Sequence, residues 1–155
     1  MIAEFAALAL LVIAIAFAVR AMRRAVAAAL IGEISETMNL LETHDVENGL
    51  AHCGDGARPA PSLPSLPTLS YRSDAAWMGL LGAHRARLSA SFYGSAQALQ
   101  GELRALSNES VGAARDDRVR YASQELQRTV ELGEEVLRSL RDIVSHHRHD
   151  LISRA

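Results

Sequence analysis

The chain has 155 residues, 49% of them hydrophobic and 5% aromatic, and its formal net charge is −2. This length holds one modest domain besides any membrane segment, and the weak overall charge argues against a nucleic-acid partner. All 16 basic residues are arginine and there is one cysteine, so the composition excludes a catalytic lysine and an internal disulfide.

An apolar run opens the chain and stops at three arginines. Residues 2–19 are Ala, Leu, Ile, Val and Phe with a single acid, and they include neither Gly nor Pro. A helix of this length would be about 27 Å long, close to the hydrocarbon thickness of a bilayer. We therefore predict that residues 1–24 form a transmembrane anchor. Its membrane-flanking residues, which we call the basic collar, are Arg20, Arg23 and Arg24.

The same run admits two other interpretations. A secretory signal peptide would begin with a positively charged segment. Here the first four residues include an acid and no basic residue, although Ala16-Phe17-Ala18 does resemble a cleavage site. A buried core helix would usually be shorter and would carry polar residues at intervals along one face. The pattern favours the membrane helix.

The placement of the arginines predicts the orientation of that helix. Arg and Lys are enriched on the cytoplasmic flank of membrane helices, and the arginines lie on the C-terminal side of the run. We therefore expect a single-pass protein of the bacterial inner membrane, with the N-terminus outside and residues 20–155 in the cytoplasm.

Beyond the collar, apolar residues recur at steps of three and four, as on one face of a helix. They are Val26, Leu30, Ile34, Met38 and Leu41. We predict that the membrane helix continues as an amphipathic, acidic stalk over residues 25–47. We expect Glu33, Glu36 and Glu42 on its other, solvated faces.

Residues 48–70 are predicted to be a linker. Asn48-Gly49 is a typical helix stop, and the segment holds all four prolines of the chain. Proline lacks the N–H that helices and central strands need. We interpret the segment as a spacer; the alternative is that its Pro-Ser-Leu repeats dock on the aromatic groove of a partner.

Residues 71–155 are predicted to form a helical hairpin, which makes the fold all-α. One helix is expected at about 74–106, with a turn or kink near Gly79 and Gly82, and a second at about 111–149. The short turn between them favours antiparallel packing, with the stalk as a possible third helix. The second helix carries a coiled-coil-like seam. Its positions are Val119, Ala122, Leu126, Val130, Gly133, Leu137, Leu140 and Val144.

Residues 71–93 resemble a segment that recurs in small single-pass proteins of the bacterial inner membrane. These proteins form a loose group of unknown function. In that group an aromatic residue precedes an Asn-containing turn, an Ile-Gly-Leu-Leu-like stretch and a helix that carries Phe-Tyr. Asp74 stands here in place of the Asn, and Gly82 in place of a frequent Pro. The resemblance implies a location in the inner membrane and no activity. The matching residues are Tyr71, Gly79, Leu80, Leu81, Phe92 and Tyr93.

The histidines near the C-terminus are the best candidates for a chemical site. On a helix, His146, His149 and Asp142 share one face, and two imidazoles with a carboxylate can bind Zn²⁺ or Ni²⁺. The simpler interpretation is a cationic helix end that interacts with the helix dipole. No dinucleotide-binding, P-loop, serine-hydrolase or zinc-protease motif is present, and we predict no cofactor and no catalytic residue.

Three hypotheses for function follow. The first is a non-enzymatic, membrane-anchored scaffold or interaction protein whose hairpin binds a protein partner or a second copy of the chain. The second is a metal-dependent enzyme or metal sensor that uses the C-terminal histidines. The third is a membrane component of a phage or a secretion system, with its helical part on the outer side; the basic collar argues against that orientation.

Overall fold

The computed structural model describes residues 2–53, 59–68, 71, 75–108 and 112–152, without the side chains of residues 2–4, 75 and 146–152. Over these residues the chain is mostly helical and contains no strand. The predictions of an all-α fold and of a long apolar helix at the N-terminus are confirmed.

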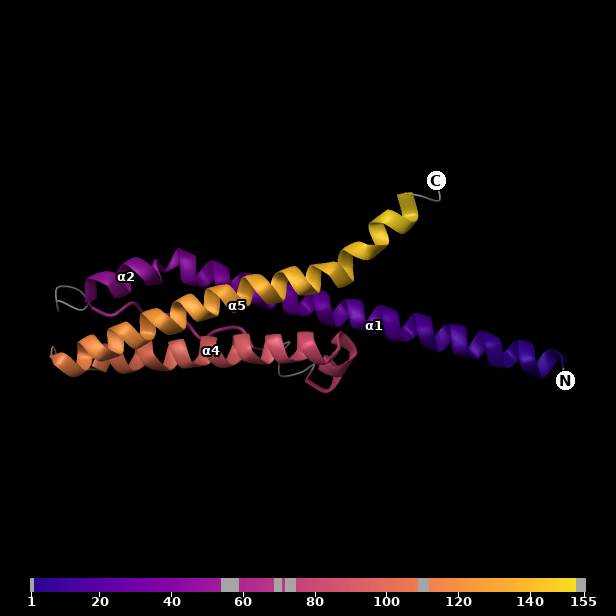
Figure 1. Ribbon diagram of the computed structural model, residues 1–155, viewed down its shortest axis with the longest axis horizontal. Coiled ribbons are helices and arrows are strands. Elements are labelled where there is room, and N and C mark those ends of the chain that lie inside the picture. Colours follow the sequence, from indigo (N-terminus) through magenta and orange to yellow (C-terminus); the bar gives the residue numbers. More distant parts are fainter. Residues whose placement is uncertain (1, 54–58, 69–70, 72–74, 109–111, 153–155) are drawn as a thin grey trace.

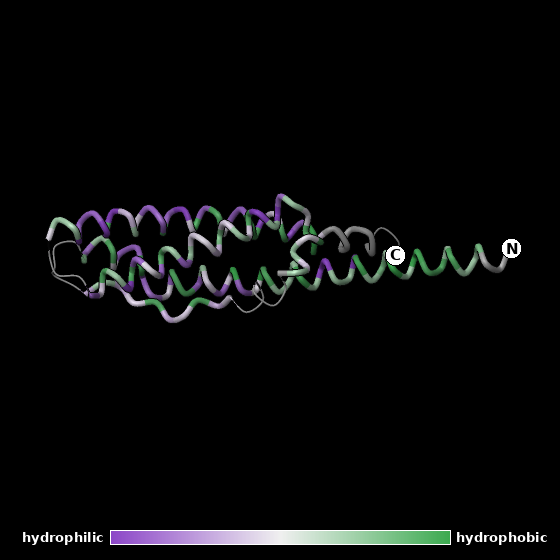
Figure 2. The backbone as a smooth tube through the Cα atoms, turned by 90° about the horizontal axis from the view of Figure 1, so that it is seen from below, coloured by the Kyte–Doolittle hydropathy of each residue, from purple (hydrophilic) through white to green (hydrophobic). Residues whose placement is uncertain are grey.

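Helix α1 (Ile2–Thr43) is one continuous helix of 42 residues. At 1.5 Å per residue it is about 63 Å long. Its first half projects from the rest of the molecule (Figure 1), and the hydrophobic colouring is continuous along that half (Figure 2). Side chains become buried from Val26 onward, where the exposed fraction falls to 5%. A single helix therefore joins the projecting rod to the helical bundle.

Helix α1 ends at a turn rather than at the expected Asn48-Gly49. Asp45 has a φ of 46°, a left-handed conformation that interrupts a helix. Helix α2 (Val46–Cys53) follows directly and includes Asn48 and Gly49. The prediction that the linker begins at residue 48 is therefore wrong, because Val46, Leu50 and Cys53 bury one face of α2 and hold it helical.

The described part of the linker, residues 59–68, has no helix or strand but is packed against the bundle. Pro61 lies against Gly49, where a Cβ would come within 2.9 Å of the proline ring. Gln100 donates a hydrogen bond of 2.8 Å to the carbonyl of Pro64, and Leu63 packs on the core. This half of the linker is thus part of the folded body.

The remaining elements are a 3-10 helix, η1 (Ala75–Leu81), and two long helices, α4 (Ala83–Asn108) and α5 (Ala113–Ile152). Gly82 separates η1 from α4 with a φ of 88°, a conformation that glycine adopts without strain. Helices α4 and α5 lie side by side and run in opposite directions, and α5 also packs along α1 (Figure 1).

The core consists of two clusters along the bundle axis. The first lies next to the projecting half of α1 and joins Val26 and Leu30 to Met78, Phe92 and Leu140. The second lies at the far end and joins Leu41 and Leu50 to Leu99, Leu106 and Leu126. We call the two ends the collar end and the distal end.

Two residues depart from the expected faces. Glu33 was expected to be solvated, yet it is 6% exposed, because α1 packs against both η1 and α5 and so buries a wider face than a single stripe. Val144 was expected on the seam of α5, yet it is 43% exposed, because the end of α5 diverges from α1 (Figure 1).

Candidate functional site

The apolar half of α1 is the first feature with a functional implication. The large hydrophobic side chains between Phe5 and Met22 are exposed, and this is one helix near the N-terminus that is long and apolar enough to cross a membrane. Arg20 is exposed, whereas Arg23 and Arg24 are half-buried. The collar therefore stands where the apolar rod enters the bundle.

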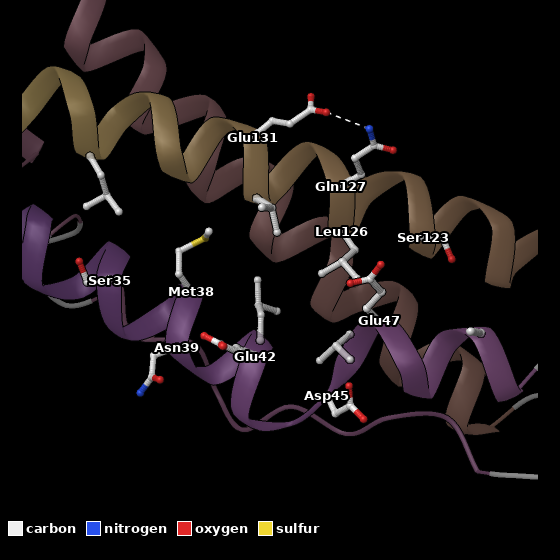
Figure 3. A pocket seen from close by; sticks show the side chains of 15 residues that line it. Ser35, Met38, Asn39, Glu42, Asp45, Glu47, Ser123, Leu126, Gln127 and Glu131 are labelled. Atoms are coloured by element: carbon white, nitrogen blue, oxygen red, sulfur yellow. Dashed lines mark hydrogen bonds between the residues drawn. The ribbon is translucent and has the colours of Figure 1, made fainter.

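The second feature is a groove between α1–α2 and α5, with a volume of about 890 Å³. Figure 3 shows Met38 of α1 and Leu126 of α5 pointing into the space between the helices. The other apolar residues of its lining are Leu41, Val46, Ala51, Val130 and Leu137. The volume lies in the range of known ligand pockets.

The sequence explains why a groove remains at this place. Gly133 of α5 lets Met38 come so close that a Cβ on Gly133 would lie 2.7 Å from the Met38 Sδ atom. Further along, the turn at Asp45 redirects the chain into α2. The two helices thus meet closely at Gly133 and leave unfilled apolar surface beyond it.

Acidic side chains surround the apolar surface. Glu42, Asp45, Glu47 and Glu131 line the groove and are exposed. Glu131 points away from α1 (Figure 3) and accepts a hydrogen bond of 2.9 Å from Gln127. Among the described residues that line the groove there is no Arg, Lys, His or Cys. The groove is therefore apolar inside and negatively charged at its edge.

No protein-family model, curated protein or solved structure matches this chain.

The residues predicted to bind metal are not brought into a site. Asp142 is exposed on α5, and the side chains of His146 and His149 lie outside the described part of the chain. Among the side chains that are described, no three His, Cys, Asp or Glu residues are grouped closely enough to hold a metal ion.

Cys53 is buried, and its thiol donates to the carbonyl of Leu50 at 3.5 Å. Arg115 is also buried and donates from Nε to the Cys53 carbonyl at 3.2 Å and from a terminal nitrogen to the Leu106 carbonyl at 3.1 Å. These carbonyls end α2 and α4, so Arg115 satisfies groups that a helix leaves unpaired at its C-terminus.

The core contains polar groups that the sequence pattern did not reveal. Ser95 of α4 donates to the Glu125 carboxylate at 2.8 Å and lies 2.9 Å from the Thr129 hydroxyl. Glu125 is 8% exposed. Near the collar end, burial and the neighbouring Glu33 carboxylate raise the pKa of Tyr93 well above its ordinary value, and Tyr71 stacks on its ring at 4.2 Å.

Proposed function

We propose that this chain is a non-enzymatic interaction protein of the bacterial inner membrane, with α1 as its single transmembrane helix. The N-terminus lies outside and the bundle in the cytoplasm. The exposed apolar half of α1 and the arginines on its C-terminal side support this arrangement. The resemblance of residues 71–93 to small inner-membrane proteins agrees with the location.

The observation that carries the proposal is the continuity of α1 from the apolar rod into the groove. Residues of the same helix flank the membrane at Arg24 and line the groove at Glu42. The lining of the groove begins on α1 at Ser35, which is 11 residues, or about 16 Å of helix, beyond Arg24. The groove is thus held at a fixed height and faces the aqueous compartment.

We infer that the groove binds a basic amphipathic helix of a partner protein. Helix-in-groove recognition places apolar residues at i, i+3, i+4 and i+7 against an apolar surface. Met38 and Leu126 provide such a surface here. The exposed carboxylates of Glu42 and Glu47 complement Arg or Lys on the polar edges of the incoming helix.

The lining residues support binding rather than catalysis. Glu42 and Glu47 are exposed at the rim, and neither stands beside a histidine or cysteine of the described lining. Nucleophilic catalysis requires a nucleophile within hydrogen-bond reach of a positioned base. We therefore assign the groove a recognition role.

A peptide titration of the full chain in nanodiscs tests the inference. The probe is an 18-residue helical peptide with Leu at i, i+3, i+4 and i+7 and Arg at the flanking positions. We expect saturable binding to the wild-type chain. The double variant Glu42→Gln/Glu47→Gln should bind about three- to tenfold more weakly, since exposed ion pairs contribute modestly.

Matched controls separate groove binding from nonspecific attraction. Glu36→Gln removes an exposed acid of α1 that does not line the groove, and it should leave the affinity unchanged. A peptide with its arginines replaced by glutamine should bind more weakly to the wild-type chain. An equal loss of affinity in Glu36→Gln and in the double variant would contradict the groove assignment.

A further inference from the structure

Trp77 is the single tryptophan of the chain, and it is 45% exposed although the short helix that carries it is packed on the bundle. Its neighbours Met78 and Leu81 are buried with Val26 of α1. Trp77 therefore projects outward from a fixed element at the collar end.

The height of this element matches the edge of a bilayer. If the apolar run of residues 2–19 fills the hydrocarbon layer, Val26 lies seven residues, or about 10 Å of helix, beyond it. The polar headgroup layer adds about 5–8 Å on each side of the hydrocarbon. Met78 and Leu81 of η1 cluster with Val26, so η1 lies at the outer edge of the headgroup layer.

The charge of the bundle changes sign along its axis. Residues 5–32 and 75–101 contain no Asp or Glu, although they carry the three collar arginines and Arg85 and Arg87. Arg85 donates from Nε to the Ser139 carbonyl at 2.9 Å, which holds the start of α4 against α5. Residues 33–55, in contrast, contain six acids and no arginine. The basic end is the one that faces the membrane.

Helix α5 adds both charge and apolar surface to the same end. Over residues 137–145 it contributes Arg138 and Arg141 together with one acid, Asp142, all of them exposed; Glu134 and Glu135 lie one turn nearer the distal end. Val144 is 43% exposed, and the end of α5 that carries it diverges from α1 (Figure 1). Among the described side chains, three large hydrophobic ones are exposed beyond the apolar rod. Trp77 and Val144 lie at the collar end, and Tyr121 lies near the distal end.

We propose that the collar end of the bundle binds anionic phospholipid, with the Trp77 indole in the headgroup layer and Arg87 on a lipid phosphate. Indole rings prefer the membrane–water interface because they combine an apolar ring with a polar N–H. Arginines near an anionic surface gain from its negative potential. This inference rests on the proposed transmembrane α1, and it fixes the bundle against the bilayer.

The single tryptophan allows a direct test on the full chain. The protein is reconstituted into vesicles of phosphatidylcholine and phosphatidylglycerol that carry a quencher either near the headgroup or deep in the acyl chains. We expect Trp77 emission to be quenched more strongly by the shallow label than by the deep one. The absence of quenching in vesicles with which the chain co-floats would overturn the lipid contact but leave the transmembrane helix standing. Failure to co-float would overturn both.

A second tryptophan position supplies the matched control. In the background Trp77→Phe, the substitution Tyr121→Trp places the indole at a site with 47% exposure near the distal end. About 19 residues of α5, or about 28 Å, separate Tyr121 from Leu140 of the collar-side cluster. We expect no lipid quenching at this position. Equal quenching at both positions would overturn the proposal.

The charge component is tested on α4. Arg87→Gln should raise about fivefold the phosphatidylglycerol fraction that gives half-maximal quenching of Trp77. Arg104→Gln, an exposed arginine of the same helix near the distal end, should have no effect. If Trp77 is quenched equally with and without phosphatidylglycerol, anionic lipid recognition is overturned.

Discussion

Met38 packs directly on Gly133. A Cβ on Gly133 would lie 2.7 Å from the Met38 Sδ atom and 3.1 Å from Cε2 of Phe92. The methionine side chain is flexible and borders the groove, but Phe92 is fully buried. The residue at position 133 therefore controls both how closely α1 approaches α5 and how open the groove is.

Gly133→Ala should destabilise the bundle although alanine favours helices. Alanine gains about 1 kcal/mol in helix propensity over glycine, whereas overpacking a core costs about 1–3 kcal/mol. We expect the free energy of unfolding to fall by up to about 2 kcal/mol. The measurement is chemical denaturation in detergent, followed by circular dichroism. Displacement of Met38 into the groove should also weaken peptide binding.

Gly101→Ala is the matched control for that substitution. Gly101 lies within α4, and a Cβ there would have no neighbour within 4 Å. The substitution should raise stability by about 0.5–1 kcal/mol. Because helix propensity is common to both variants, their difference isolates the contact with Met38 and Phe92. Equal stabilisation by both substitutions would show that Met38 and Phe92 move aside for the added methyl group without lowering the free energy of unfolding.

The hydrophobic periodicity of the sequence correctly predicted which face of a helix is buried where that face depends on the helix alone. Leu30, Ile34 and Leu41 are buried on α1 as their spacing indicated. Glu33 and Val144 were placed on the wrong faces, since burial at these positions depends on which neighbours flank α1 and where α5 leaves the bundle. Hydrophobic spacing carries no information about those neighbours.

The groove could be inferred from the sequence only in part. The excess of acids between residues 33 and 55 was visible, but their position beside apolar residues of α5 depends on three segments that meet in space. The sequence pattern placed Gly133 on the seam of α5 but did not indicate that it is a site of close helix approach. Asn48 and Gly49 carry a stop signal, which the burial of Val46 and Leu50 overrides.

Ser95→Ala should destabilise the contact between α4 and α5. The substitution removes the hydrogen bond to the Glu125 carboxylate and leaves a buried acceptor with one partner fewer, at a cost of about 1–3 kcal/mol. The free energy of unfolding should fall by that amount. Ser91→Ala, an exposed position of the same helix, should change it by less than about 0.5 kcal/mol. Equal effects of the two variants would argue against a structural role for the buried hydrogen bonds.

Tyr93 should make the stability of the bundle sensitive to alkaline pH. Burial, and then the Glu33 carboxylate, raise the pKa of Tyr93 in the folded chain above the ordinary value of 10.0. The folded state therefore retains a phenol proton that the unfolded state releases. Above pH 10.0, stability should fall by about 1.4 kcal/mol for each further pH unit; below that pH this effect is absent.

Tyr93→Phe should remove that alkaline slope, because phenylalanine has no proton to lose. The measurement is the free energy of unfolding between pH 8 and 11. Tyr121→Phe serves as the control, since Tyr121 is 47% exposed and its substitution should leave the slope unchanged. A slope that persists in Tyr93→Phe would assign the alkaline sensitivity to another group.

The basic collar should determine the orientation of α1. A fluorescent reporter fused after residue 155 should be active in the cytoplasm. A phosphatase that is active only in the periplasm should be inactive when it is fused at the same position.

Replacing Arg20, Arg23 and Arg24 by Gln, together with Ala3→Arg and Glu4→Arg, moves the positive charge to the other flank. A substantial share of the molecules should then invert, because the Arg and Lys bias near a membrane helix sets its orientation. Arg104→Gln/Arg128→Gln removes two exposed arginines near the distal end and should leave the reporter readings unchanged. Phosphatase activity in the wild-type fusion would place the bundle on the outer side and favour the phage or secretion hypothesis.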